Sequence, residues 1–232
     1  MNSRLTHWIV GIASLALPLA VLGAGGGGMD GGGGGSMPAP RQQSPEDMAK
    51  SAYNDGVRAV KQAKKYEEDL AAAKDDKKEK IAERLSKQYQ KARTYFATAV
   101  SKKDTMHEAW NYVGYTSRKL GEYDNALAAY DKALSLKPDY AEAIEYRGEA
   151  YVWMNRLDDA KKAYMDLFRD QRQMANDLMV VMEQWVKERR ANAAGVAPAD
   201  IDNFAKWLSE RSTIAQQTAS LAADAPHTSI WN

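Results

Sequence analysis

Apolar residues recur at helical spacing and in a repeating frame along this chain. Met174, Leu178, Val181 and Trp185 follow one another at i, i+4, i+7 and i+11, which predicts one buried face of a helix. Upstream, residues 107–140 align with residues 141–174 at a shift of 34 residues. The aligned pairs include Trp110 with Ile144, Gly114 with Gly148, Tyr123 with Leu157, Ala126 with Ala160 and Tyr130 with Tyr164. Self-similarity at this period predicts a protein built from stacked repeats.

The two units resemble the tetratricopeptide repeat (TPR) of exported bacterial proteins. At positions 4, 8, 20, 24, 27 and 32 of the family's sequence pattern, the first unit carries the expected residues Trp110, Gly114, Ala126, Tyr130, Ala133 and Pro138. The second carries Ile144, Gly148, Ala160, Tyr164 and Leu167, with Arg172 in place of the proline. The resemblance implies an all-α solenoid of helical hairpins, in which Gly and Ala lie where two helices cross closely. We therefore expect TPR units at residues 107–140 and 141–174.

An earlier and longer unit is expected at residues 45–106. Gly56 fits the repeat's glycine position, but it precedes Ala92 by 36 residues, whereas Gly114 precedes Ala126 by 12. About 24 extra residues, shared between two helices, lengthen each by about 18 Å. This predicts a first helix from Pro45 to about residue 71 and a protruding, charged hairpin with its tip near residues 74–77. One unbroken long helix is the alternative, because AAAKDDKKEK contains no strong helix breaker.

The mixed charges of this hairpin have two interpretations. Mixed-sign runs are typical of a solvated helix surface. The second hypothesis is that the hairpin is a docking arm, which contacts a partner, since solubility alone does not require two extra helical segments.

Residues 175–224 are expected to form degenerate TPR-like capping helices, as terminal repeats often do. Met182 takes the place of the repeat glycine, so these helices should pack less closely. Asp200 is the predicted N-cap of a last helix that reaches about residue 222 and is buried through Phe204, Leu208 and Ile214. Residues 225–232 are predicted to be a loose tail.

The N-terminus is typical of an export signal. Arg4 precedes an uncharged apolar run, WIVGIASLALPLAVL, which is short for a membrane-spanning helix. We interpret residues 1–24 as a signal peptide and the Gly- and Pro-rich residues 25–44 as a disordered linker. If the signal is not cleaved, the same segment anchors the repeats to a membrane. The chain has no cysteine. The expected location is periplasmic or secreted.

The sequence contains no pattern that indicates catalysis or a bound cofactor. Its three histidines have no companion at metal-ligand spacing, and no nucleophile, zinc or phosphate-loop motif occurs. We therefore expect no enzyme activity, no cofactor and no metal. Lys plus Arg is 32 and Asp plus Glu is 31, so the charge balance gives no reason to expect nucleic acid as a partner.

The resemblance implies that the first helices of the repeats line a groove that binds a peptide or a partner protein. Seven residues at the family's groove positions are the candidate binding residues: Tyr53, Asn111, Tyr115, Arg118, Glu142, Glu145 and Glu149. The glutamates replace the basic residues that bind a C-terminal carboxylate in this family. They favour a partner that carries Lys or Arg instead.

The predicted function is thus that of an exported, non-catalytic scaffold or adaptor. Two alternatives remain open. The repeats could mediate self-association into a homo-oligomer, or the chain could be an accessory subunit of an enzyme complex in the cell envelope.

Overall fold

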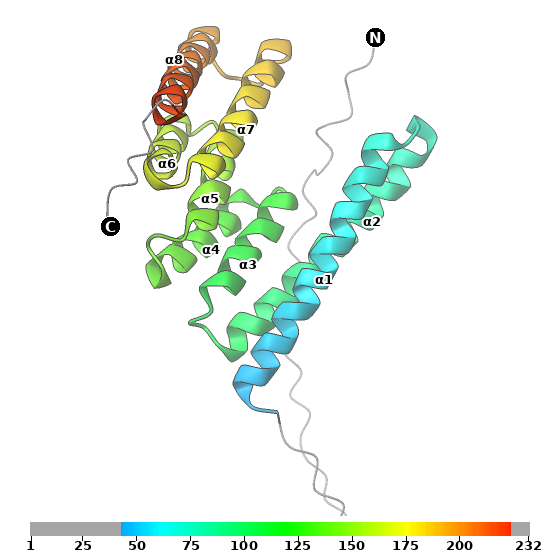
Figure 1. The fold of residues 1–232 in the computed structure, drawn as a ribbon. Coiled ribbons are helices and arrows are strands. Elements are labelled where there is room, and N and C mark those ends of the chain that lie inside the picture. The colour runs from blue at the N-terminus through cyan, green and yellow to red at the C-terminus, as the bar shows by residue number, and fades with distance from the viewer. Residues whose placement is uncertain (1–42, 224–232) are drawn as a thin grey trace, which may run out of the picture.

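Residues 43–223 of a computed structural model are described, and this part of the chain folds into eight α-helices with no strand (Figure 1). The helices are α1 (Pro45–Ala72), α2 (Asp75–Lys102), α3 (His107–Lys119), α4 (Tyr123–Leu136), α5 (Ala141–Trp153), α6 (Leu157–Asp170), α7 (Arg172–Ala191) and α8 (Pro198–Ala223). The predicted signal peptide, the tail and nearly all of the predicted linker lie outside the described residues.

The helices form consecutive hairpins that stack into a solenoid. Within the hairpins, α1 packs along α2, α3 along α4, α5 along α6 and α7 against α8. Between hairpins, α3 packs on α2, α5 packs on α3 and α4, and α7 packs on α5 and α6. The predicted all-α solenoid of helical hairpins is confirmed.

The first hairpin projects well beyond the others (Figure 1). Its two helices have 28 residues each, against 13 and 14 in the next hairpin. The helix breaks at Ala73 and Lys74, so the alternative of one unbroken helix was wrong. Fully buried residues extend only to Ala63 on α1 and Tyr89 on α2, so the distal half of the hairpin lacks a closed core.

Glycines lie where helices of the solenoid touch. A Cβ atom on Gly56 would come within 2.6 Å of the Phe96 ring, and one on Gly114 within 2.5 Å of the Tyr130 ring. A Cβ on Gly148 would come within 2.7 Å of Leu178, so this glycine also sets the approach of the following hairpin. These distances are too short for a side chain, which explains the repeat's glycine position.

The turn between paired helices uses a left-handed residue in both regular repeats. Gly121 has φ 78°, and Asn155, 34 residues later, has φ 59°. Asparagine tolerates this conformation better than most residues. Its Oδ1 also accepts a hydrogen bond of 3.1 Å from the indole Nε1 of the fully buried Trp185 on α7. The turn of one repeat therefore also stabilises the packing of the next hairpin through this hydrogen bond.

The C-terminal pair differs from the sequence expectation in one detail. Helix α8 begins at Pro198, so Asp200 lies in its first turn and is not its N-cap. Proline at the first helical position already has a suitable φ, and an acidic residue in the first turn interacts favourably with the helix dipole. Phe204 and Leu208 are buried as predicted, and Ile214 is partly buried.

Candidate functional site

The seven predicted binding residues lie on the first helices of three successive hairpins. Tyr53 is on α1, Asn111, Tyr115 and Arg118 are on α3, and the three glutamates are on α5. A chain of ring contacts joins these helices. The ring of Tyr53 lies 5.7 Å from that of Tyr112, and the ring of Tyr115 lies 5.3 Å from that of Tyr146. The structure therefore brings α1, α3 and α5 side by side, so that residues far apart in the sequence lie on neighbouring helices.

Four of the seven predicted residues have little exposed surface. Tyr115 is 7% exposed and Asn111 is 2% exposed. The guanidinium of Arg118 pairs with the carboxylate of Glu149, and both side chains are largely buried. It also lies 5.6 Å from the ring of Tyr115 and 5.5 Å from that of Tyr146. This pair bridges α3 and α5, so it has a packing role in addition to any contact with a partner.

The structure adds residues that the groove positions had not selected. Tyr112 and Tyr146 are partly exposed, lie 34 residues apart and occupy the same place in successive repeats. The ring of Tyr112 stacks on Phe96 at 4.6 Å and contacts Tyr53. The 34-residue spacing was a signal that sequence reasoning could have used to find them.

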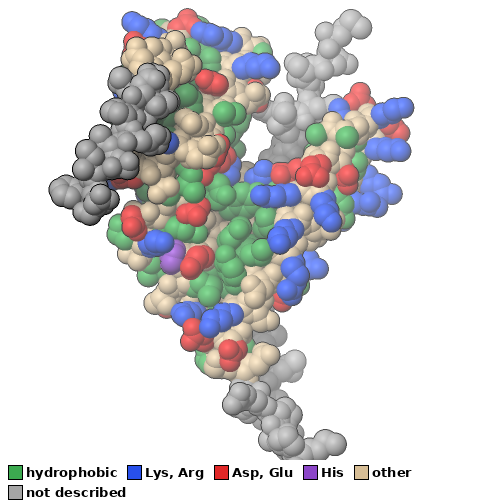
Figure 2. Space-filling view, in the orientation of Figure 1, with side chains coloured by type: hydrophobic (Ala, Val, Ile, Leu, Met, Phe, Trp, Pro, Cys, Tyr) green, Lys and Arg blue, Asp and Glu red, His purple; other side chains and the backbone are tan. Residues whose placement is uncertain are grey.

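We define the Tyr–Glu face as the surface formed by the partly exposed tyrosines and glutamates of α1, α3 and α5. Its members are Tyr53, Tyr112, Tyr146, Glu108, Glu142 and Glu145. Figure 2 shows a continuous area of hydrophobic side chains over these helices, with Asp and Glu side chains beside it and many Lys and Arg side chains on the long hairpin. The surface is therefore both aromatic and acidic.

Burial and the nearby glutamates raise the pKa values of the tyrosine hydroxyls on this face. Burial, followed by the proximity of Tyr112, Glu108 and Glu142, raises the pKa of the Tyr53 hydroxyl to about 12. Burial and Glu142 also raise the pKa of Tyr112. These phenols stay neutral at physiological pH, so the negative charge of the face comes from its carboxylates.

Glu145 is the most perturbed carboxyl group of the face. Burial, and then the negative charges of Glu149 and Asp177, raise its pKa to about 7. Arg118 lowers this pKa, but its guanidinium is already engaged by Glu149. Among the described residues, no ion pair includes Glu145 or Glu142. The face thus carries acidic groups without a cation of their own.

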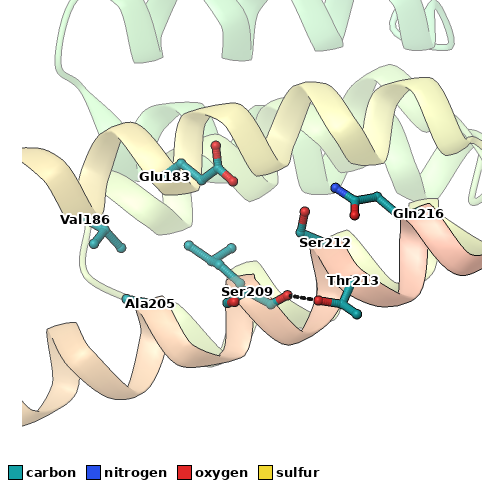
Figure 3. A pocket seen from close by; sticks show the side chains of 8 residues that line it. Glu183, Val186, Ala205, Ser209, Ser212, Thr213 and Gln216 are labelled. Carbon is teal, nitrogen blue, oxygen red and sulfur yellow. Dashed lines mark hydrogen bonds between the residues drawn. The ribbon is translucent and has the colours of Figure 1, made fainter.

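A separate pocket of about 350 Å³ lies between the last two helices (Figure 3). Glu183 and Val186 of α7 line one side, and residues of α8 from Ala205 to Gln216 line the other. Ser209, Ser212, Thr213 and Gln216 make much of the lining polar, and the Thr213 hydroxyl donates to the Ser209 carbonyl at 3.0 Å. The pocket contains none of the predicted binding residues, and its lining suggests no reaction.

Within residues 43–223, no group of three or more His, Asp or Glu side chains could hold a metal ion. No helix in the same range combines the length and the apolar character needed to cross a bilayer. The predicted signal segment lies outside this range.

Comparison with known proteins supports a TPR repeat protein. Residues 114–154 match the family model of the TPR repeat. Superkiller complex protein 3 of Homo sapiens is 29% identical over 87 residues, which are 35% of this chain and 5% of that protein. The uncharacterized protein ycf37 of Guillardia theta is 33% identical over 60 residues, which are 26% of this chain and 34% of that protein. The chain therefore spans about a third or less of the length of these curated relatives.

Solved TPR structures resemble the fold. The Arabidopsis OM64 TPR domain has a TM-score of 0.46 at 15% identity and covers 62% of this chain and 99% of its own. The first TPR of Spaghetti (RPAP3), solved with the HSP90 peptide SRMEEVD, has a TM-score of 0.46 at 16% identity and covers 61% of this chain and 95% of its own. The all-α fold of stacked helical hairpins is shown by the helices of the described residues and their packing.

Proposed function

We propose that this protein is a non-catalytic, exported scaffold or adaptor that binds a segment of a partner protein on the Tyr–Glu face. One observation carries the proposal. Partly exposed tyrosines from three successive hairpins lie beside Glu142 and Glu145, which have no ion pair among the described residues, and folding alone does not require unpaired acids beside partly exposed aromatic rings.

Each component of the face favours binding to protein. Tyrosine supplies a large contact area at low cost in conformational entropy, and it is enriched in interaction surfaces. The glutamates attract a segment that carries Lys or Arg and repel an acidic one. The packing of α3 on α2 and of α5 on α3 fixes these side chains on rigid helices, so little ordering is needed when a partner binds.

A charge-reversal variant tests this function. The double variant Glu142→Lys/Glu145→Lys should lose the partners that the wild-type chain crosslinks in extracts of its native compartment. The control Asp166→Lys/Glu210→Lys changes the net charge equally at exposed positions of α6 and α8, and it should retain them. Circular dichroism confirms that both variants are folded. If the folded double variant keeps every partner, the proposed binding surface is wrong.

Self-association is the alternative use of the same face. The long hairpin carries many Lys and Arg side chains among its acidic ones (Figure 2), and in a dimer these cations would contact the acidic face of a second copy. Light scattering of the purified chain separates the two cases. A monomer at high protein concentration excludes self-association, whereas a dimer that the control variant retains and the double variant loses would replace the adaptor function.

A further inference from the structure

The second helices of the last two hairpins, α6 and α8, meet through aromatic side chains. The ring of Tyr164 on α6 lies 5.4 Å from that of Trp207 on α8 and stacks on Phe168 at 5.5 Å. Tyr164 is fully buried, whereas Phe168 and Trp207 are partly exposed. Met165, the next residue along α6, is 44% exposed. The Tyr–Glu face lies on other helices, so this is a separate surface.

Two guanidinium groups border these rings. That of Arg172 lies 3.7 Å from the centre of the Phe168 ring, and that of Arg211 lies 6.0 Å from the centre of the Trp207 ring. Burial raises the pKa of the Tyr164 hydroxyl, and both Arg211 and Arg172 lower it. The two cations therefore lie near the same hydroxyl group, one from each side of the aromatic contact.

The described residues provide no carboxylate for either guanidinium. Neither Arg172 nor Arg211 forms an ion pair within residues 43–223. Arg172 donates to the neutral hydroxyl of Thr218 at 3.0 Å. The Nε of Arg211 is buried without an acceptor, and the buried hydroxyl of Tyr164 also lacks a hydrogen-bond partner. Buried polar groups usually have partners, so this arrangement requires an explanation.

Both guanidinium-bearing side chains can be reached from outside the protein. Arg172 is exposed, and Arg211 is partly exposed. Because no ion pair fixes Arg211, rotation of its side chain presents two N–H groups to the two oxygens of one carboxylate. A carboxylate bound there would also lie beside the partly exposed rings, where its attraction to the cations is stronger than in water.

The charges around this surface argue against a polyanion as the ligand. A nucleic acid or an anionic membrane binds a broad basic surface. Here Asp158 and Asp170 of α6 and Glu210 of α8 are exposed on the same two helices. The pair of arginines is therefore suited to a single acidic group, and Met165 and the rings are suited to an apolar neighbour of that group.

We propose that α6 and α8 carry a second docking surface, which binds an Asp or Glu side chain of a partner protein together with an adjacent apolar residue. We call it the Arg–Trp surface, and its members are Met165, Phe168, Arg172, Trp207 and Arg211. This inference goes beyond the proposed function, because the adaptor then has two surfaces of opposite charge preference. The Tyr–Glu face favours a basic segment, and the Arg–Trp surface favours an acidic one.

Short peptides test the Arg–Trp surface on the full chain. The probes are the tripeptide leucine–glutamate–leucine with both ends blocked and its glutamine counterpart, and inorganic phosphate is titrated separately. Nitrogen–proton NMR spectra follow the backbone amides and the indole N–H signals. We expect saturable shifts at residues 164–172 and 207–211 with the glutamate peptide, and roughly threefold weaker binding of the glutamine peptide. Equal binding of the glutamine peptide, or equally tight binding of phosphate at these residues, would overturn the proposal.

Variants assign the binding to the two arginines. Arg172→Gln/Arg211→Gln removes both charges and should weaken the glutamate peptide by roughly fivefold or more. The control Arg169→Gln removes one charge from the same region, where the guanidinium pairs with Asp170 and the side chain is 79% exposed. It should bind the peptide as the wild type does. Unchanged binding in the folded double variant contradicts the proposal.

Two other occupants of the Arg–Trp surface are outcomes of the same experiments. Asp224 directly follows α8 in the sequence. If the wild type does not bind the glutamate peptide but Asp224→Asn does, the chain's own C-terminal residues occupy the surface and the proposal is wrong. If light scattering shows a dimer that Arg172→Gln/Arg211→Gln loses, the occupant is a second copy, which also overturns the proposal.

The two surfaces can fail independently. Glu142→Lys/Glu145→Lys changes only the Tyr–Glu face and should bind the glutamate peptide as the wild type does. If this variant loses the crosslinked partners while Arg172→Gln/Arg211→Gln still binds the peptide normally, the Arg–Trp surface is wrong and the proposed function stands. If the crosslinked partners depend only on the two arginines, the Arg–Trp surface is correct and the Tyr–Glu face is wrong.

Discussion

The guanidinium of Arg118 on α3 pairs with the carboxylate of Glu149 on α5, and the two largely buried side chains join successive repeats. Burial, the largest single effect, lowers the pKa of Arg118, but Glu149, Tyr130 and Tyr115 together raise it above its ordinary value, so the guanidinium stays charged. Removing one partner leaves an uncompensated charge in the interface. We expect Arg118→Met to lower the free energy of unfolding by about 3 kcal/mol in urea titrations.

A double variant distinguishes the ion pair from simple packing. Arg118→Met/Glu149→Met removes both charges and should be more stable than either single variant, because no isolated charge remains. Additive losses in this mutant cycle would mean that the two side chains act independently.

The close approach of Gly114 to Tyr130 gives a second prediction. In Gly114→Ala the new Cβ would lie 2.5 Å from the ring of the fully buried Tyr130, so one of the two helices must shift. Overpacking costs about 1–3 kcal/mol, whereas the higher helix propensity of alanine recovers about 1 kcal/mol. We expect a net loss of stability by thermal denaturation. Ser51→Ala, an exposed site on α1, is the control and should change the melting temperature little.

Two substitutions of Asn155 separate the contribution of its backbone conformation to stability from that of its hydrogen bond to Trp185. Asn155→Gly keeps a residue suited to φ 59° but loses the acceptor for Trp185, which should cost about 1 kcal/mol. Asn155→Ala loses the acceptor and also the tolerance of positive φ, which should cost about 1 kcal/mol more. Chemical denaturation of the two variants measures both differences. Equal stability of the Gly and Ala variants would show that the backbone conformation does not contribute.

The raised pKa of Glu145 predicts that the stability of the fold depends on pH. Its pKa is about 7 in the folded chain and near 4.5 when exposed, so between these values the folded chain holds the proton more strongly. Stability from this group is therefore greatest at low pH and is lost as the pH rises from 4.5 through 7. Glu145→Gln should be more stable than the wild type at pH 8, on the order of 1 kcal/mol because the group is only partly buried, and the gain should vanish near pH 4.5. A gain that is independent of pH would contradict this ionisation.

The long hairpin should show a gradient of local stability. Its fully buried residues end at Ala63 on α1 and Tyr89 on α2, and most of the residues beyond them are exposed. Amide hydrogens of residues 67–84 should therefore exchange with solvent faster than those of residues 49–60. Hydrogen exchange with mass spectrometry measures both segments in the same sample. Uniform protection along α1 would mean that the distal half is held by contacts outside this hairpin.

The location and cleavage of the N-terminal segment remain predictions from the sequence. Residues 1–42 lie outside the described part of the chain. The mass of the mature protein tests the cleavage, because removal of residues 1–24 lowers the mass and leaves the Gly-rich segment at a free end.

The repeat frame of the sequence determined the fold of this protein, because its glycines, alanines and tyrosines recur where two helices meet at fixed spacing. The inserted length before Ala92 likewise determined the long hairpin. The sequence did not determine where α8 begins, because Asp200 is suitable both as a cap and as a first-turn residue. It also did not show which groove residues remain accessible. Only packing between repeats decided that Arg118 and Glu149 satisfy each other while Glu145 stays unpaired, since ionic pairing depends on distances between helices that no single repeat contains.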